Sequence, residues 1–273
     1  MRMARVAAGA MVKTTAAAAD RLRQPGRGVV VLLYHRVGRR TDATVDLPVE
    51  LFARQMEALA GTARVVSLDQ ALDLLAQPEP PPERVLAVTF DDGSADFTEV
   101  ALPVLVRHRL PVTLYVATDF VERGVRFPKG EPPASWSSLG DAVSTGLVTI
   151  GSHTHTHRLL DRAPPEEARD ELTRSSRLIE DRLGVPAEHF AYPKAVLGSP
   201  AAEEAVRGRF RSAALAGTKV NPCGATDPYR LARSPIQVGD GMRWFRRKAD
   251  GGMALEDQLR QLANRRRYSG ATT

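Results

Sequence analysis

Short runs of apolar residues alternate with helical patterns along most of the chain. Val29–Tyr34 (VVVLLY) and Arg84–Phe90 (RVLAVTF) are largely continuous apolar runs, a pattern typical of strands that are buried on both faces. The same reasoning predicts further strands at Arg64–Leu68, Val112–Ala117, Leu147–Ile150, His189–Tyr192, Arg211–Ala216 and Tyr229–Pro235.

The segments between these strands carry apolar residues at helical spacing, as Leu51, Met56 and Leu59 do. Helices are therefore predicted at Pro48–Leu59, Leu68–Leu75, Asp96–Arg107, Trp136–Thr145, Glu166–Leu183 and Ala201–Arg207. Strands that alternate with helices favour a parallel α/β barrel, in which catalytic residues lie where strands end. An open doubly wound sheet has the same alternation and stays an alternative at this point.

Composition and charge narrow the class of protein. Of the 273 residues, 43% are hydrophobic and 26% are charged, which predicts a globular chain with one large core or two small ones. The net charge is +6, and arginines and lysines gather at both ends of the chain. These basic ends either dock on an anionic membrane surface or an acidic polymer, or are simply solvated. No nucleic-acid-binding motif accompanies them, so no nucleic-acid partner is expected, and the oligomeric state is left open.

The N-terminus has only some features of a secretory signal. Arg2 and Arg5 precede an Ala-rich stretch, but Lys13 interrupts the apolar run. No run approaches the roughly 20 apolar residues of a membrane helix. Cys223 is the only cysteine, so an intrachain disulfide is impossible, which fits a reducing compartment. We therefore expect a cytoplasmic chain that touches the membrane through its basic ends, with secretion left open.

The first chemical motif is Thr89-Phe90-Asp91-Asp92-Gly93, at the end of the strongest predicted strand. Adjacent residues on a strand point to opposite sides, so one carboxylate can face a metal ion and the other a substrate water. Gly93 permits the tight turn that follows. The same letters also form an ordinary turn signal, so this motif alone leaves the function open.

The second motif is the histidine-rich segment that follows another predicted strand, Gly151–His157 (GSHTHTH). His153 and His157 are four residues apart and share a face if the backbone coils, which is metal-ligand spacing. His155 would then point away from the metal, to a buried neighbour or to solvent. In an extended segment all of these histidines would share a face, and the alternative to a metal site is an exposed polar loop. A histidine-rich tract at a strand end, with acids elsewhere, favours the metal site.

Together these motifs resemble the polysaccharide deacetylase family (NodB homology domain, carbohydrate esterase family 4). The resemblance covers about residues 28–240 and is nearest to the branch that deacetylates poly-N-acetylglucosamine, in which FAYP replaces an Arg-x-Pro motif. Besides TFDDG and His-Thr-x-x-His, it rests on Leu33–Val37 (LYHRV), Trp136–Leu139 (WSSL), Phe190–Pro193 (FAYP) and Tyr229–Arg233 (YRLAR).

This resemblance implies an irregular (β/α) barrel with about seven strands. The deacetylase domain would span residues 27–250, between an N-terminal basic arm or helix (1–26) and a C-terminal basic helix or tail (251–273).

The resemblance also implies a role for individual residues. Asp91 would be the general base, and the metal ligands would be Asp92, His153 and His157. Two histidines and one aspartate with an open position suit Zn²⁺, with Co²⁺ or Ni²⁺ as alternatives. The ion would act as a Lewis acid on the acetyl carbonyl, and the backbone N–H of Lys194 would stabilise the oxyanion.

Three positions depart from the family pattern. The motif arginine that orients the base aligns with Ala191, the glycine two residues after the motif proline is Ala195, and the late Leu-x-His motif that carries the general acid is missing. We expect His35 to serve as the acid, because it ends the first predicted strand on the same rim as Asp91. Otherwise His35 caps its strand, and Asp91 itself returns the proton to the leaving amine.

Three further residues are predicted to contact the substrate. Trp136 stacks on a sugar face, or is instead a core aromatic at a helix start. Tyr192 belongs to the FAYP motif. Arg233 is the conspicuous polar residue of the last predicted strand, where the alternative is a salt-bridged arginine at the barrel rim.

The sequence therefore predicts a metal-dependent hydrolase that removes N-acetyl groups from an amino sugar or an N-acetylglucosamine-containing glycan and releases acetate. An O-acetyl ester or a small amino-sugar intermediate would suit the same site. A non-catalytic carbohydrate-binding protein is the alternative of another class, motivated by the missing arginine and histidine. Neither the fold nor the chemistry fixes the substrate.

Overall fold

Seven parallel strands close into a barrel in the computed structural model, which describes residues 13–15, 26–128 and 130–258. Strand β1 pairs with β5 from Val29↔Val85 to Tyr34↔Phe90, and this pairing closes the sheet. The predicted barrel is confirmed, and the open sheet is excluded. In order around the barrel, the strands are β1 (Gly28–Tyr34), β11 (Leu231–Pro235), β9 (Ser212–Ala216), β8 (His189–Ala191), β7 (Val148–Ser152), β6 (Val112–Val116) and β5 (Val85–Phe90).

Short strands lie at the margins of the barrel. Strand β4 (Arg64–Val65) extends the sheet beside β5, and β10 (Asn221–Pro222) runs antiparallel to β1. Strands β2 (Arg36–Val37) and β3 (Asp46–Leu47) form a separate small sheet. The sequence did not predict β2, β3 or β10, because their residue pairs lie outside the apolar runs, whereas the equally short β4 lies within the predicted strand Arg64–Leu68.

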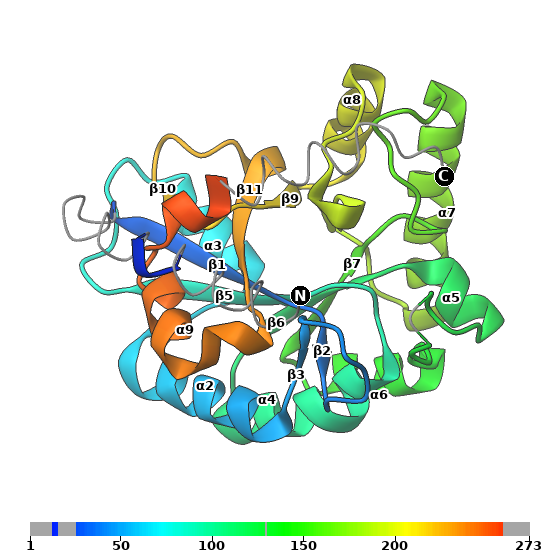
Figure 1. Cartoon of the computed structure of the whole chain (residues 1–273). Helices are drawn as coiled ribbons and strands as arrows, with labels where there is room; N and C mark the ends of the chain where they lie inside the picture. Colours follow the sequence, from blue (N-terminus) through cyan, green and yellow to red (C-terminus); the bar gives the residue numbers. More distant parts are fainter. Residues whose placement is uncertain (1–12, 16–25, 129, 259–273) are drawn as a thin grey trace.

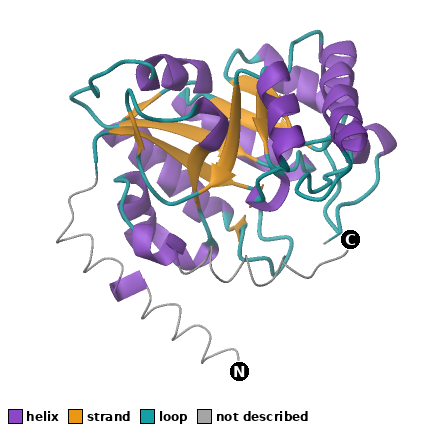
Figure 2. Ribbon diagram, turned by 90° about the horizontal axis from the view of Figure 1, so that it is seen from above, coloured by secondary structure: helices purple, strands orange, loops and turns teal. Residues whose placement is uncertain are grey.

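Helices surround the barrel (Figures 1 and 2), with α2, α4 and α6 along one side and α7 and α8 along another. The sequence did not predict helices α5 and α9. The helix after β5 begins as a π-helical turn and continues as α4. The helices are α2 (Val49–Thr62), α3 (Leu68–Leu75), α4 (Leu102–His108), α5 (Thr118–Arg123), α6 (Trp136–Ser144), α7 (Pro165–Leu183), α8 (Pro200–Arg209) and α9 (Gly241–Ala249), and the short turns are η1 (Phe97–Ala101), η2 (Pro193–Ala195), η3 (Pro228–Arg230) and η4 (Val238–Asp240).

Side chains on the inner face of the barrel form a core of their own, separate from the core under the helices. Helix α3 belongs to this inner core and packs near the starts of β1 and β5, so it covers the amino end of the barrel. The opposite end, where the strands finish, is left for the loops that follow them. The inner core contains Val29, Val31, Val66, Leu68, Ala71, Leu75, Val85, Ala87, Tyr115, Ala191, Ala214 and Leu231.

Most of the predicted basic arm (1–26) and much of the predicted tail (251–273) lie outside the described residues.

Candidate functional site

Asp92, His153 and His157 gather at the carboxyl end of the barrel. One ligand atom from each lies within 4.8 Å of the other two. Asp92 Oδ1 is 3.8 Å from His153 Nε2 and 3.6 Å from His157 Nε2. Zn²⁺ holds such ligands at about 2.0–2.2 Å in a tetrahedron, which places neighbouring ligand atoms roughly 3.4 Å apart. The spacing and the mixture of two nitrogens with one oxygen therefore fit a divalent metal ion.

The backbone of this cluster is unusual. Asp92 has a φ of 77° and His157 a φ of 62°, and Thr154 between the histidines has a φ of 63°. Side chains other than glycine rarely adopt this left-handed region, and such strain concentrates at functional sites. His153 and His157 are therefore brought together by an irregular turn, and not by the helical coil that their spacing suggested.

The imidazoles are oriented for metal binding. His153 Nδ1 donates a hydrogen bond to the carbonyl of Ala191 at 2.8 Å, so Nε2 carries the lone pair that faces Asp92. The His157 ring meets the His153 ring edge to face, 4.9 Å between centroids. Burial, reinforced by the nearby His153, lowers the pKa of His157 to about 4, so His157 is neutral at neutral pH, as a ligand must be.

His155 turns away from this cluster. Its Nδ1 is hydrogen-bonded with the hydroxyl of Thr118 at 2.9 Å, and its Nε2 lies 3.6 Å from Asp119. His155 is buried against the first residues of α5. His155 therefore anchors the loop and leaves the ligand positions to its neighbours.

Asp91 faces the inside of the barrel and is bound by Arg233. The guanidinium donates two hydrogen bonds, Nη1 to Oδ1 at 2.6 Å and Nη2 to Oδ2 at 2.9 Å. Burial raises the pKa of Asp91, but the charge and hydrogen bonds of Arg233, together with the nearby His153 and His35, outweigh this effect and bring the pKa to about 2. Asp91 is therefore an ionised carboxylate beside the metal-ligand cluster, with Oδ2 3.9 Å from His153 Nε2.

The prediction that Arg233 contacts the substrate is wrong, because Arg233 is fully buried inside the barrel. Besides Asp91, its guanidinium donates to the Leu215 carbonyl and the Thr89 hydroxyl, and it lies 5.1 Å above the Tyr115 ring. The rim salt bridge was the correct alternative. Its partner is Asp91, so Arg233 holds this carboxylate in place from β11, and not from the position of Ala191 on β8.

Small residues make room for this arrangement. Ala87, Ala191 and Ala214 occupy the inner face on the neighbouring strands. A Cβ added at Gly151 would lie 2.7 Å from the Tyr115 ring, so glycine lets that ring cross the barrel beneath Arg233. The sequence contained two indications that Arg233, and not a residue at position 191, binds Asp91. An arginine within a buried strand needs a carboxylate, and an alanine stands where the motif arginine is expected.

His35 lies close to this group. Burial lowers its pKa, and the negative charges of Asp92 and Asp91 oppose that shift. Its Nδ1 is buried and has no hydrogen-bond partner among the described residues. The predicted position on the same rim is thus observed, while its role as an acid stays a prediction. The lowered pKa means that a catalytic His35 must first take up a proton.

The other predicted residues are placed differently. Lys194 is exposed in η2, with a φ of 53°, and its charge acts on His157. The prediction that Tyr192 binds substrate is wrong, because it is 1% exposed and packs outward against Phe190 in the core under α7 and α8. Trp136 packs against the outer core and donates to Glu122 at 2.7 Å. Its predicted stacking on a sugar is untested.

This chain is similar to a known protein family and to proteins of known structure. Residues 79–208 match the family model described as polysaccharide deacetylase. IcaB from Ammonifex degensii has a TM-score of 0.72 and 27% identity, over 83% of this chain and 99% of that one. The Streptococcus pyogenes deacetylase PplD, solved with acetate, shares the fold with a TM-score of 0.69 at 20% identity, over 87% and 98% of the two chains.

One curated relative is similar over a shorter stretch. The chitooligosaccharide deacetylase of Bradyrhizobium sp. (strain ANU 289) is 33% identical over 97 residues, which is 35% of this chain and 39% of that protein.

Proposed function

Because the chain belongs to the polysaccharide deacetylase family, we propose that it is a metal-dependent hydrolase that removes N-acetyl groups from an amino sugar or an N-acetylglucosamine-containing glycan. One observation carries the proposal. An ionised, arginine-bound Asp91 lies beside Asp92, His153 and His157, whose ligand atoms converge. The alternative of a non-catalytic carbohydrate-binding protein fails, since the family and the complete group of acid and ligands both indicate an enzyme.

Asp92, His153 and His157 would hold the metal ion, for which we propose Zn²⁺, with Co²⁺ or Ni²⁺ as substitutes. A divalent ion bound there supplies Lewis-acid polarisation of the acetyl carbonyl and of the attacking water. The hydrogen bond from His153 to Ala191 fixes the tautomer that such binding needs.

Asp91 acts as the general base in this proposal. It takes a proton from water as the water oxygen forms a bond to the carbonyl carbon, and the bidentate contact with Arg233 holds the carboxylate ionised and in place. The backbone N–H of Lys194 would donate to the oxyanion. The carbon–nitrogen bond then breaks, and the products are acetate and a free amine.

The leaving amine must be protonated, because an amide anion is too poor a leaving group. We propose His35 as the donor, supported by its place directly after β1, where the neighbouring Tyr34 carbonyl accepts a hydrogen bond from the Asp91 N–H. The competing route returns the proton from Asp91. An O-acetyl ester, or a small amino-sugar intermediate, remains an alternative substrate for the same groups.

We also propose a location inside the cell, with contact to the membrane through the basic ends. No described helix has the length and apolar character needed to span a bilayer. Lys13 is buried against Asp240 and pairs with Glu256, which supports retention of the N-terminal segment in the folded protein. Mass spectrometry of the native protein tests this, since cleavage within residues 10–30 would contradict it.

The proposed function is tested by two variants measured side by side for bound metal and acetate release. His153→Ala removes a ligand, so elemental analysis should show loss of the metal together with loss of turnover. Asp91→Asn leaves the ligands intact, so it should keep the metal and lose about 10²–10⁴-fold in turnover, the usual cost of removing a general base. Full metal occupancy in His153→Ala, or a wild-type rate in Asp91→Asn, would refute the corresponding assignment.

A further inference from the structure

The segment from His153 to His157 carries two of the proposed metal ligands, yet it has no regular secondary structure. Thr154 and His157 hold left-handed backbone angles that cost free energy. Such a conformation persists only where surrounding contacts impose it. Two contacts come from the start of α5, where Thr118 binds the His155 ring and the Asp119 N–H donates to the His155 carbonyl at 2.8 Å.

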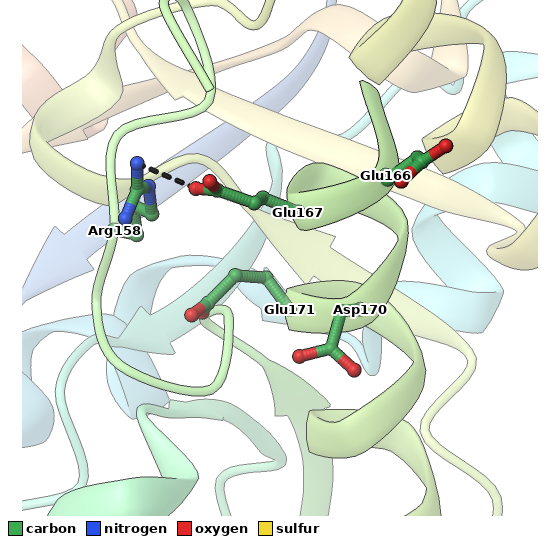
Figure 3. A pocket seen from close by; sticks show the side chains of 5 residues that line it. All are labelled: Arg158, Glu166, Glu167, Asp170 and Glu171. Atoms are coloured by element: carbon green, nitrogen blue, oxygen red, sulfur yellow. Dashed lines mark ion pairs between the residues drawn. The ribbon is translucent and has the colours of Figure 1, made fainter. Parts of the chain in front are cut away.

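The other side of the segment is held by one carboxylate, that of Glu171 on α7. Glu171 Oε2 accepts hydrogen bonds from the backbone N–H groups of His155 and Thr156, both at 2.8 Å. Its Oε1 accepts from the Thr156 hydroxyl at 2.7 Å. In Figure 3 the side chain reaches from the helix toward the loop. Hydrogen bonds to an ionised acceptor are about twice as strong as neutral ones, and these are shielded from water, since Glu171 is only 7% exposed.

We propose that Glu171 is a positioning residue for the metal centre, which fixes the distance between His153 and His157 by clamping the two peptide groups between them. This inference rests on the proposed metal-dependent function. It adds a determinant of metal affinity that touches neither the ion nor the substrate. A flat carboxylate that binds adjacent N–H groups sets the turn of the chain, and the turn sets where the imidazoles point.

The same helix provides a matched control. Glu167, one turn before Glu171, also faces the loop, where it pairs with Arg158 at 2.6 Å. That pair is exposed, with the two side chains 51% and 40% accessible, so it is screened by water. Glu167→Ala removes the same charge from the same helix, but its ion-pair partner Arg158 lies outside the His153–His157 segment. It should therefore leave metal binding unchanged.

The experiment uses the full chain and measures the Zn²⁺ dissociation constant by competition with a chromophoric chelator, together with the visible spectrum of the Co²⁺-loaded protein. Circular dichroism and thermal unfolding verify the fold of each variant. Glu171→Ala should weaken Zn²⁺ binding by about 10–100-fold, the usual cost of removing a group that supports a ligand, and should shift the Co²⁺ bands. Glu171→Gln keeps an acceptor oxygen for both N–H groups, so it should restore most of the affinity.

A folded Glu171→Ala with wild-type Zn²⁺ affinity and an unchanged Co²⁺ spectrum would overturn the inference and leave the proposed function standing. If that variant does not fold, Glu171→Asp takes its place, because it keeps the charge but withdraws the carboxylate by one methylene. Wild-type affinity in a folded Glu171→Asp would overturn the inference equally. A wild-type chain that binds no divalent ion would refute the proposed metal dependence first, and the role of Glu171 with it.

Discussion

Two histidine-centred groups lie at opposite ends of the barrel strands and invite comparison. At the carboxyl end, His153 follows β7 and faces Asp91 and Asp92. At the amino end, His189 opens β8, with Nδ1 2.9 Å from the Ser212 hydroxyl and Nε2 3.4 Å from Asp69. Serine, histidine and aspartate in contact are the residue types of a nucleophilic triad. On residue types alone, the amino-end group has as strong a claim to catalysis.

Geometry separates the two groups. Ser212 and His189 have no exposed surface, so no substrate can reach the serine. At the carboxyl end, Asp92 and His157 are 16% and 25% accessible, and their ligand atoms converge on one point. Left-handed residues also surround that end, at Asp92, Thr154 and His157. Access, convergence and backbone strain therefore favour the carboxyl-end group as the candidate active site, whereas residue types do not distinguish the two groups.

The largest loss of activity is expected from His35→Gln, which tests the carboxyl-end group. If His35 protonates the leaving amine, hydrolysis of an acetamide should fall by about 10²–10⁴-fold, while an activated acetyl ester, whose leaving group needs no proton, is cleaved almost normally. Steady-state assays with both substrates measure the difference. Equal losses on the amide and the ester would assign His35 to structure or binding instead.

Removing the arginine at the centre of the barrel should affect both stability and pH dependence. Arg233→Met leaves a buried carboxylate without its partner, which should cost about 3–5 kcal/mol of unfolding free energy. The pKa of Asp91, about 2 with Arg233 present, should rise because only His153 and His35 then oppose the raising effect of burial. The acidic limb of kcat/KM should therefore move to higher pH. Denaturant unfolding and a pH–rate profile measure the two effects.

The pKa of Asp91 also determines how the free energy of unfolding changes with pH. A depressed pKa in the folded state stabilises the protein above the ordinary pKa of aspartate, and this stabilisation is lost as pH falls toward about 2.

Arg230→Met is the control for Arg233→Met, since Arg230 is half exposed and pairs with Glu203 outside the barrel. An unshifted acidic limb in Arg233→Met would show that Arg233 does not govern the ionisation of Asp91.

The smallest effect is expected at the amino end. Ser212→Ala leaves His189 Nδ1 without its partner, which should cost about 1–3 kcal/mol of stability and leave kcat/KM unchanged. Urea unfolding and the acetate-release assay report the two quantities. A loss of turnover comparable to that of Asp91→Asn would show that the amino-end group takes part in the chemistry.

The sequence predicted the order of long strands and helices because their periodicity is local. Helix α3 has its predicted bounds, and β1 and β5 differ by one residue from the predicted strands. The positions of Asp91, Asp92, His153 and His157 followed from strand ends and family motifs. The ends of strands can be recognised in the sequence, and strands of a parallel barrel finish on the same rim, so residues at strand ends are expected to lie close together.

Two corrections concern the direction in which a side chain points. Tyr192 follows Ala191, whose side chain faces the barrel interior, and strand alternation turns the tyrosine outward into the helical layer. Arg233 pairs with the carboxylate of Asp91, which follows β5 and is 142 residues away in the sequence, so no local pattern encodes the contact. Glu171 was missed for the same reason, because on the sequence it is one acid among many on an exposed-looking helix.

The bond between Arg233 and Asp91 joins the first half of the chain to its last barrel strand, and it has a consequence for biosynthesis. Residues 79–208, which match the family model, include Asp91 and every proposed metal ligand but end before Arg233. A chain emerging from the ribosome therefore acquires the proposed metal ligands well before it acquires the arginine that binds Asp91. The Arg233–Asp91 pair forms only when β11 docks between β1 and β9, so a product terminated before β11 would carry the proposed ligands without this pair.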